Sequence, residues 1–204
     1  MGLYERAVFN PGMDWVLSRP AVEAERARLL AAARGAVLEI GVGTGLNLPH
    51  YPSAVTAITA AAPAAALDRR AAGRARDRGI AIELVNAPAE SLPMADASFD
   101  TVVSTFVLCT VADPAAAIAE LARVLRPAGR ILFLEHVVRR RGAGRIIQRV
   151  LDPIHRPLTC GCSLVRDTAG ALAARFELDE IAEQDLPGLP YTVKRVIRGS
   201  GRAA

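Results

Sequence analysis

The stretch from Ala36 to Asn47, AVLEIGVGTGLN, constrains the fold of this chain more than any other. Its first five residues form a short apolar run that is typical of a β-strand buried on both faces. Three alternate glycines follow, Gly41, Gly43 and Gly45. Glycine accepts positive φ angles and lets the main chain approach a ligand closely, because it has no Cβ. The stretch therefore predicts a buried strand that ends in a ligand-binding loop.

The spacing of the glycines narrows the class of ligand. The loop reads Glu-x-Gly-x-Gly-x-Gly from Glu39 and lacks the lysine of a phosphate-binding P-loop. A dinucleotide-binding Gly-x-Gly-x-x-Gly would need its third glycine at position 46, where this chain has Leu46. This register argues against a nicotinamide-dependent oxidoreductase.

Apolar runs and helical patterns alternate along most of the chain. Strands are predicted over residues 36–40, 55–59, 81–85, 101–105, 130–136, 176–182 and 191–197, and helices over residues 21–33, 63–78, 114–125, 145–151 and 164–174. Alternation of this kind indicates parallel strands joined by right-handed crossovers. We therefore predict a single α/β domain over residues 1–204.

Three stretches together resemble the successive motifs of the class I S-adenosylmethionine (SAM) methyltransferases. They are residues 38–45 with the glycine loop, Ser98-Phe-Asp100 before an apolar strand, and residues 123–130, RVLRPAGR, before another. The resemblance implies a Rossmann-like, seven-stranded, mostly parallel sheet with a reversed last strand and helices on both faces. It also implies that the cofactor is SAM, bound at the carboxyl ends of the first strands.

Further stretches resemble a narrower group, the methyltransferase-like thiol S-methyltransferases and their bacterial relatives. They are residues 107–111, 135–137, 151–153 and 161–168. Members with known activity methylate small alkyl thiols. The resemblance thus implies methyl transfer to a small, fairly apolar acceptor, with a thiol favoured. The alternatives are a phenol, an amine or a quinone-type carbon as acceptor, or a degenerate SAM pocket that serves only as a binding module.

The resemblance also implies a set of cofactor contacts. Glu39 and the three glycines would hold the methionine end, and Thr59 and Ala60 would meet the ribose. The other predicted contacts are Asn47, Ala89, Glu90, Thr105 and Phe106. Family members usually carry an acidic residue where this chain has Thr59, and a hydroxyl cannot form the charge-assisted pair of hydrogen bonds that a carboxylate gives. We expect this change to cost about 1–3 kcal/mol of SAM binding.

His136 is the candidate catalytic residue, because an imidazole titrates near neutrality and can accept the proton of a thiol. A histidine that only hydrogen-bonds a neighbouring loop is the alternative. The predicted acceptor contacts are Trp15, Cys109, His136, Asp152, His155 and Cys162. Several of them fall within residues 137–175, the insertion in which this fold usually places acceptor specificity. A helix end at Asp152 and Pro153 is the favoured structural interpretation of that pair.

Residues 1–34 are predicted to form an N-terminal arm and a helix. The arm carries Phe9 and Trp15, the latter being the only tryptophan of the chain. It is interpreted either as a lid whose aromatic residues pack over the site or as a leader that they anchor to the core. The arginines and glutamates of the helix over 21–33 are interpreted as a solvated face.

Composition narrows the class of partner. The chain has 25 basic and 21 acidic residues, and a diffuse net charge of +4 does not require nucleic acid. Apolar runs of about 18 residues and a signal peptide are both missing from the sequence, so we expect a cytoplasmic protein. A solvated helix entry is favoured over membrane contact for the arginines between 139 and 149. The partner is thus expected to be a small-molecule acceptor, and the oligomeric state is not predicted.

The three cysteines, Cys109, Cys160 and Cys162, are too few for a disulfide framework. A Cys-Gly-Cys pair can bind metal, but the sequence shows no second pair and no neighbouring histidine cluster to complete a tetrahedral site. We therefore predict free thiols near a pocket and no metal site. Cys109 is interpreted as a small apolar wall of the acceptor side rather than a nucleophile.

Overall fold

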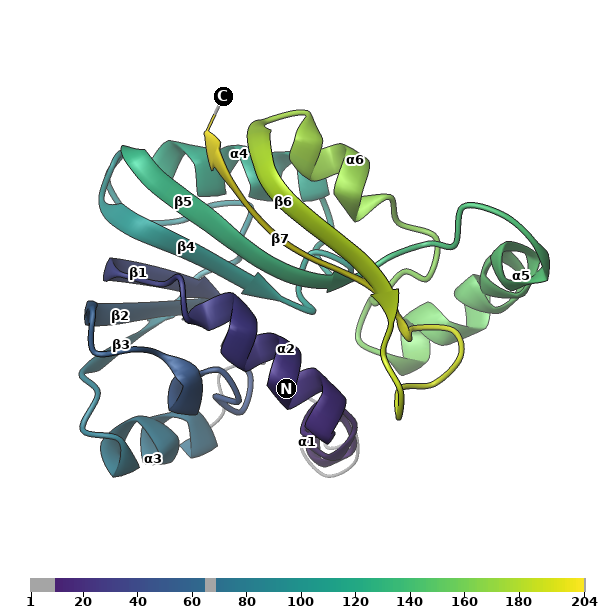
Figure 1. Cartoon of the computed structure of the whole chain (residues 1–204), viewed down its shortest axis with the longest axis horizontal. Helices are drawn as coiled ribbons and strands as arrows, with labels where there is room; N and C mark the ends of the chain where they lie inside the picture. Colours follow the sequence, from purple (N-terminus) through teal and green to yellow (C-terminus); the bar gives the residue numbers. More distant parts are fainter. Residues whose placement is uncertain (1–9, 65–68, 204) are drawn as a thin grey trace.

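The centre of the protein is a parallel sheet built around β1 (Gly35–Ile40) (Figure 1). The computed structural model describes residues 10–64 and 69–203. Within these residues, seven strands form one sheet in the order β3-β2-β1-β4-β5-β7-β6. The parallel neighbours are β2 (Val55–Ala62), β3 (Ile82–Asn86), β4 (Phe99–Thr105) and β5 (Leu125–His136).

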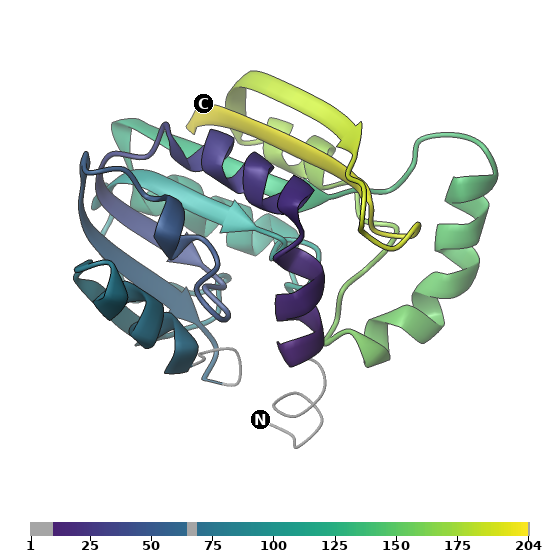
Figure 2. The same ribbon diagram turned by 60° about the horizontal axis from the view of Figure 1, so that its bottom comes forward.

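The last strand is reversed. β7 (Arg195–Ala203) runs antiparallel between β5 and β6 (Phe176–Asp185). The parallel strands all end at one edge of the sheet, where the loops that follow β1, β4 and β5 meet (Figures 1 and 2). The predicted α/β fold, with its mostly parallel seven-stranded sheet and reversed last strand, is confirmed.

Helices cover both faces of the sheet (Figure 1). One apolar core lies under α2 (Pro20–Leu30) and α3 (Arg69–Asp77). A second core lies on the opposite face under α4 (Pro114–Val124) and α6 (Thr168–Ala173). Because both faces are covered, the central strands are apolar almost throughout, as expected for parallel sheets.

Three elements lie outside these layers. α1 (Asn10–Leu17) and the short 3-10 helix η2 (Leu48–His50) lie near the carboxyl ends of β1 and β2. α5 (Ala143–Leu158) stands apart from the sheet in both views (Figures 1 and 2). Among the described residues, no helix combines the length and the apolar character needed to cross a bilayer.

The sequence prediction was wrong at the end of β2. This strand continues to Ala62 instead of ending at Thr59, and residues 63 and 64, which were predicted to open a helix, are not helical. The described part of that helix is Arg69–Asp77. Alanine has a weak intrinsic preference for strands, but residues 60–62 pair with β1 and β3 in the buried centre of the sheet. Such packing overrides local propensity.

The prediction was also wrong after β5. α5 continues seven residues past the predicted end at Leu151, through Pro153 and Pro157. A proline removes one donor from a helix but does not always end it when tertiary contacts hold the flanking turns. Here the Asp152 carboxylate accepts a hydrogen bond of 2.6 Å from the Leu164 amide, which ties the helix to the chain that follows it.

The closing strands differ in their bounds. β7 begins at Arg195 rather than at residue 191, because residues 191–193 form a turn. In this turn the amides of Val193 and Lys194 both donate to the carbonyl of Pro190. β6 is three residues longer than predicted, which gives β7 a partner along its whole length.

Candidate active site

The loop after β1 adopts a conformation that glycine alone accepts easily. The φ angles of Gly41, Gly43 and Gly45 are +62°, +51° and +84°. A Cβ on Gly41 would lie 2.4 Å from a methyl carbon of Val107, so no larger residue fits there without movement. Beside Gly43, the nearest described atom beyond its neighbours is the Gly41 carbonyl oxygen, 3.8 Å from the Cβ position. Bare main chain therefore borders open space above β1.

α1 is fastened to this loop by polar contacts. The hydroxyl of Thr44 donates a short hydrogen bond to the Asp14 carboxylate. Arg74, on α3, donates to the Thr44 carbonyl at 2.6 Å and to Asp14 at 3.2 Å. Burial acts to raise the pKa of Asp14, but the hydrogen bonds from Thr44 and Arg74 outweigh it and lower this pKa. The N-terminal arm thus reaches the site through Asp14.

Trp15 was predicted to contact the acceptor as part of a lid over the site, and the structure does not place it there. The Trp15 side chain is 63% exposed, so it does not pack over the site. Its ring instead stacks with the guanidinium of Arg19, 3.6 Å from the ring centroid. Phe9, the other aromatic residue proposed for the lid, lies outside the described residues. Asp14 and Trp15 are adjacent in α1, so their side chains point in different directions from the helix. Because Asp14 faces the glycine loop, Trp15 does not.

A buried hydrogen-bond network lies directly under the glycine loop. The Asn47 amide donates to the Glu39 carboxylate at 3.0 Å and to the Thr105 hydroxyl at 2.9 Å. The Tyr51 hydroxyl donates to the second oxygen of Glu39 at 2.7 Å. Arg26 of α2 donates to the Asn47 side-chain oxygen at 2.5 Å. The structure thereby brings together three residues that the sequence predicted for the cofactor site: Glu39, Asn47 and Thr105.

The network contains two buried ionisable groups, the carboxyl of Glu39 and the guanidinium of Arg26. Burial raises the pKa of Glu39 to about 7, and the hydrogen bonds from Tyr51 and Asn47 and the charge of Arg26 only partly oppose this. Arg26 is buried, and its Nε atom lies 3.6 Å from the Glu23 carboxylate, beyond hydrogen-bond distance. A buried guanidinium whose nearest carboxylate is only loosely paired can also bind the carboxylate of a ligand. The network can therefore receive a ligand that carries one.

Sequence analysis missed Arg26, because the charged residues of its helix were interpreted as a solvated face. That interpretation is wrong for both Glu25 and Arg26, which are buried. A signal was available in the spacing. Arg26 lies four residues after Val22 and four before Leu30, on the stripe that a helix turns toward its core. A cation on such a stripe indicates a buried partner or a ligand.

The ribose contacts were assigned to the wrong part of β2. Thr59 and Ala60 lie two or three residues before the end of the strand, where Ala60 pairs with Glu39 and is fully buried. The residues level with the glycine loop are Ala61, whose carbonyl accepts the Gly41 amide, and Ala62. Neither has a polar side chain, so a carboxylate at the carboxyl end of β2 is absent from this chain.

Ala89 and Glu90, the two residues predicted to contact the adenine, both have other roles in the structure. Ala89 is buried in the core beneath α4. The Glu90 carboxylate accepts hydrogen bonds from the amides of Ala112 and Asp113, at 2.8 and 3.3 Å. Glu90 thus holds the entry of α4, and its carboxylate is already engaged by protein donors.

The loop after β4 begins with a strained residue. Phe106 has a φ of +57°, a conformation that side chains other than glycine rarely adopt. Its ring lies 5.9 Å from the Arg26 guanidinium, beside the network under the glycine loop. Glu135 holds the next residues, since its carboxylate accepts from the amides of Val107 and Leu108 at 3.1 and 3.3 Å. Strain of this kind concentrates at functional sites.

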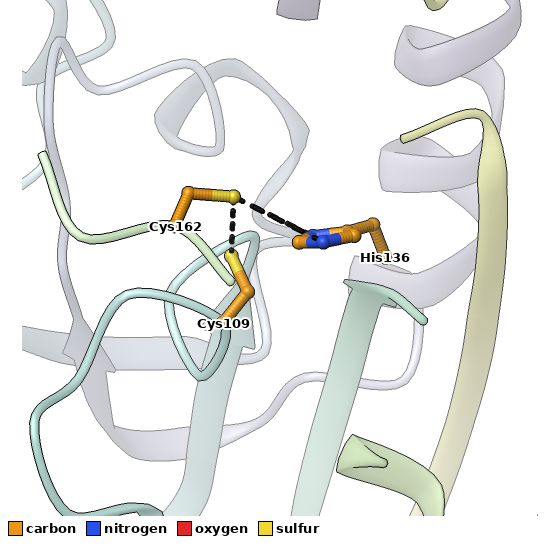
Figure 3. Close-up of side chains that lie close together, drawn as sticks. All are labelled: Cys109, His136 and Cys162. Carbon is orange, nitrogen blue, oxygen red and sulfur yellow. Dashed lines mark hydrogen bonds between the residues drawn. The ribbon is translucent and has the colours of Figure 1, made fainter. Parts of the chain in front are cut away.

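Three predicted acceptor residues meet at the ends of β4 and β5 (Figure 3). The sulfur atoms of Cys109 and Cys162 lie 3.6 Å apart. The Cys162 sulfur lies 4.0 Å from Nδ1 and 3.9 Å from Nε2 of His136. Nε2 of His136 also lies 3.1 Å from the Ser163 carbonyl oxygen, which accepts its hydrogen bond. We call these three residues, Cys109, His136 and Cys162, the sulfur–imidazole cluster.

The surroundings of the cluster shift the pKa values of its two thiols in opposite directions. Hydrogen bonding to Cys162 and burial raise the pKa of Cys109. The contacts of Cys162 with Cys109, His136 and His155 lower its pKa despite burial. Burial also acts to lower the pKa of His136, but Cys162, Glu135 and the Ser163 carbonyl raise it on balance. The surroundings therefore favour loss of the proton from Cys162 rather than from Cys109.

Asp152 and His155, the remaining predicted acceptor residues, both lie on α5. Asp152 is buried, and its carboxylate holds the chain at Leu164. His155 acts on the pKa of Cys162, and its Nε2 is buried without a hydrogen-bond partner among the described residues. The sequence predicted all three members for the acceptor side but not their direct contact, because two of them come from separate loops and His136 from the end of β5.

The fold, the bare glycine loop and the buried network beneath it together match the class I SAM-dependent methyltransferases, a class whose cofactor is SAM. The family model described as a methyltransferase domain matches residues 38–133. The YcgJ protein of Bacillus subtilis has a similar fold, with a TM-score of 0.69 and 17% identity over 89% of this chain and 99% of that chain.

Relatives with assigned activities are more similar in sequence. Human thiol S-methyltransferase TMT1B is 37% identical over 142 residues, which are 68% of this chain and 58% of the human protein. A phosphatidylethanolamine N-methyltransferase of Cereibacter sphaeroides is 35% identical over 122 residues, or 59% of this chain and 60% of that protein. The chain thus spans less than two thirds of the length of each of these relatives.

Proposed function

We propose that this chain transfers the methyl group of SAM to the sulfur of a small, fairly apolar thiol. The observation that carries the proposal is the 37% identity to a human thiol S-methyltransferase over 142 residues. The chemistry of the acceptor side supports it, because two thiols and an imidazole lie together at the carboxyl ends of β4 and β5.

SAM supplies a methyl carbon that is electrophilic because it is bonded to a positively charged sulfonium. The main chain of residues 41–45 would hold its methionine end. The guanidinium of Arg26, whose Nε lies 3.6 Å from the Glu23 carboxylate, would bind the carboxylate of that end, and Asn47 would keep Arg26 in position. Because Arg26 is buried, the Coulomb attraction between its charge and that carboxylate would be stronger than in water.

The reaction is an in-line displacement. The sulfur of the acceptor forms a bond to the methyl carbon, the bond from that carbon to the sulfonium breaks, and its electron pair stays on the departing sulfur. Alignment of the reacting atoms and exclusion of water supply most of the rate enhancement. The acceptor must also lose its thiol proton. The role of His136 as the base that takes it stays a prediction.

The proposal is tested with purified protein, SAM and a panel of alkyl thiols, phenols, and amines that include phosphatidylethanolamine. Calorimetry with SAM is measured first, and a Gly43→Val variant, which places a side chain in the open space of the loop, serves as the cofactor-blocked control. Methylated thiols, identified by mass spectrometry and absent from the control, are expected. Products confined to amines or phenols would overturn the thiol assignment, and a chain that binds no SAM would be a degenerate binding module.

A further inference from the structure

The sulfur–imidazole cluster has the ligand types of a zinc site. Cys109 and Cys162 offer sulfur and His136 offers an imidazole nitrogen, and these ligand atoms all lie within 4.8 Å of one another. Cys109 and His136 are buried, whereas Cys162 is partly exposed. Two cysteines and one histidine form a recognised ligand set of catalytic zinc, which keeps one position open.

The distances fit a tetrahedral ion. Zinc–sulfur bonds of about 2.3 Å at tetrahedral angles put two sulfur ligands about 3.8 Å apart, and a sulfur and a nitrogen ligand about 3.6 Å apart. The two sulfur atoms here are 3.6 Å apart, and Cys162 lies 4.0 Å from Nδ1 of His136. The Cys109–His136 edge is at most 4.8 Å, and the Cys162 sulfur is almost equally far from both ring nitrogens. Side-chain shifts of up to about an ångström would therefore seat the ion.

The surroundings of His136 support the same interpretation. Its Nε2 donates to the Ser163 carbonyl, which fixes the tautomer in which Nδ1 carries the free lone pair. Metal-binding histidines characteristically donate their second ring nitrogen to a carbonyl or carboxylate in this way. His155 contacts Cys162, but it lies outside the group of mutually close ligand atoms in the described part of the chain. In this arrangement it is not a ligand, and the fourth position is open to an external one.

We infer that Cys109, His136 and Cys162 bind a zinc ion whose open position accepts the sulfur of the acceptor thiol. The inference deepens the proposed function and depends on it for the identity of the fourth ligand. In this arrangement His136 is a ligand instead of the base, so the thiol binds the ion as a thiolate and releases its proton to solvent. A lone pair of this sulfur forms the bond to the methyl carbon, the bond to the sulfonium breaks, and a neutral thioether leaves. Zinc is neither oxidised nor reduced, and it keeps the thiolate nucleophilic at neutral pH.

The experiment uses the full chain, reduced and freed of metal by a chelator, with Co²⁺ as the spectroscopic probe. We expect one cobalt ion per chain, with the charge-transfer absorption of thiolate ligands and the visible bands of tetrahedral coordination. Cys109→Ser and Cys162→Ser should each remove roughly half of the charge-transfer intensity, because each removes one of two thiolates. Cys160→Ser, an exposed cysteine outside the cluster, is the matched control and should leave the spectrum unchanged.

Ethanethiol added to the cobalt protein should raise the charge-transfer absorption, whereas ethanol at the same concentration should not. A spectrum without thiolate bands, or one that survives both cysteine variants, would overturn the metal site. A Cys109–Cys162 disulfide in protein that binds no cobalt would also overturn it. Cobalt bands that ignore ethanethiol would overturn the open position. None of these measurements needs SAM or turnover, so failure of the methyl-transfer assay and failure of this inference are distinguishable.

A second site rests on a different observation, the outer face of α5. Four large aliphatic side chains at steps of four residues are each between 56% and 66% exposed. They are Ile146, Val150, Ile154 and Leu158. Ile147 and Leu151 flank this stripe and are also exposed. A contiguous apolar helix face of this kind usually marks a contact with another apolar phase.

The orientation of α5 is fixed from its inner side. Gly144, Gln148 and Asp152 are buried, and Gln148 donates to the Thr192 carbonyl at 2.8 Å. The helix therefore cannot turn its apolar face inward. Basic residues lie on one side of α5 and in the loop before it: Arg140, Arg141, Arg145, Arg149 and Arg156. Arg140, Arg145 and Arg149 also line a cavity beside the helix.

The geometry points to docking of α5 on an anionic bilayer surface, with the aliphatic stripe at the acyl boundary and the arginines among the headgroups. This combination of an apolar face and a basic border is typical of helices that lie in a membrane interface. Pairing of α5 with a second copy of the chain is disfavoured, because it would bring the two sets of arginines together without acidic partners on the same face.

Vesicle sedimentation tests this second proposal. We expect the protein to bind vesicles of phosphatidylcholine with phosphatidylserine, to bind pure phosphatidylcholine less, and to dissociate with added salt. The double variant Val150→Ser with Ile154→Ser should lose binding, whereas Ile181→Ser, an exposed residue on β6, should not. Equal binding to neutral vesicles, no binding at all, or a dimer that the same double variant disrupts would overturn the proposal.

Discussion

Replacement of Glu39 by glutamine tests the buried network under the glycine loop. Burial holds the pKa of this carboxyl at about 7, above its ordinary value of 4.5. The folded state therefore binds a proton that the unfolded chain has already lost between these two pH values. Stability contributed by the neutral carboxyl is complete below about pH 4.5 and is lost as the pH rises to about 7. The difference corresponds to about 3 kcal/mol.

Glu39→Gln cannot ionise, but it keeps an oxygen to accept the Tyr51 hydroxyl. We expect the free energy of unfolding of the natural chain, minus that of the variant, to fall by about 3 kcal/mol between pH 4.5 and pH 8. Urea denaturation followed by circular dichroism, at several pH values and without cofactor, measures this difference. The subtraction removes every other titrating group, including Glu135, whose pKa burial also raises. A difference that stays constant with pH would refute the reasoning, because Glu39 would then remain ionised beside Arg26.

Three further predictions concern the cofactor site. Arg26→Gln should weaken SAM binding roughly ten- to a hundredfold by calorimetry, because it removes a charge-assisted hydrogen bond; unchanged affinity would show that another group holds the carboxylate. Thr59→Asp should not tighten SAM binding. It should lower the free energy of unfolding by roughly 0.2–1 kcal/mol, because Thr59 lies opposite Glu83 in the sheet and two carboxylates would then repel each other. A gain in SAM affinity would restore Thr59 as the ribose contact. Asp14→Asn should weaken SAM binding severalfold and speed proteolysis within α1, because it loosens the clamp on Thr44; unaltered proteolysis would show that other contacts hold α1.

Local chemistry explains why much of the fold was predictable. The apolar run before Gly41, the alternation of strands with helices, and the glycine spacing are properties of neighbouring residues. They predicted the parallel sheet and a loop of bare main chain. The prediction was wrong where packing overrides propensity. At Ala60–Ala62 burial between two strands extends β2, and at Pro153 tertiary contacts carry α5 through a residue that usually ends a helix.

The sequence by itself determined the class of this protein, because a strand followed by Glu-x-Gly-x-Gly-x-Gly carries its geometric requirement in consecutive residues. The tertiary structure alone decided which distant side chains meet. It buried Arg26 beside Asn47 and assembled Cys109 and Cys162, from two loops, with His136 at the end of β5. Contacts between residues far apart in the chain depend on how the layers pack. No periodicity or spacing within a single segment records that packing.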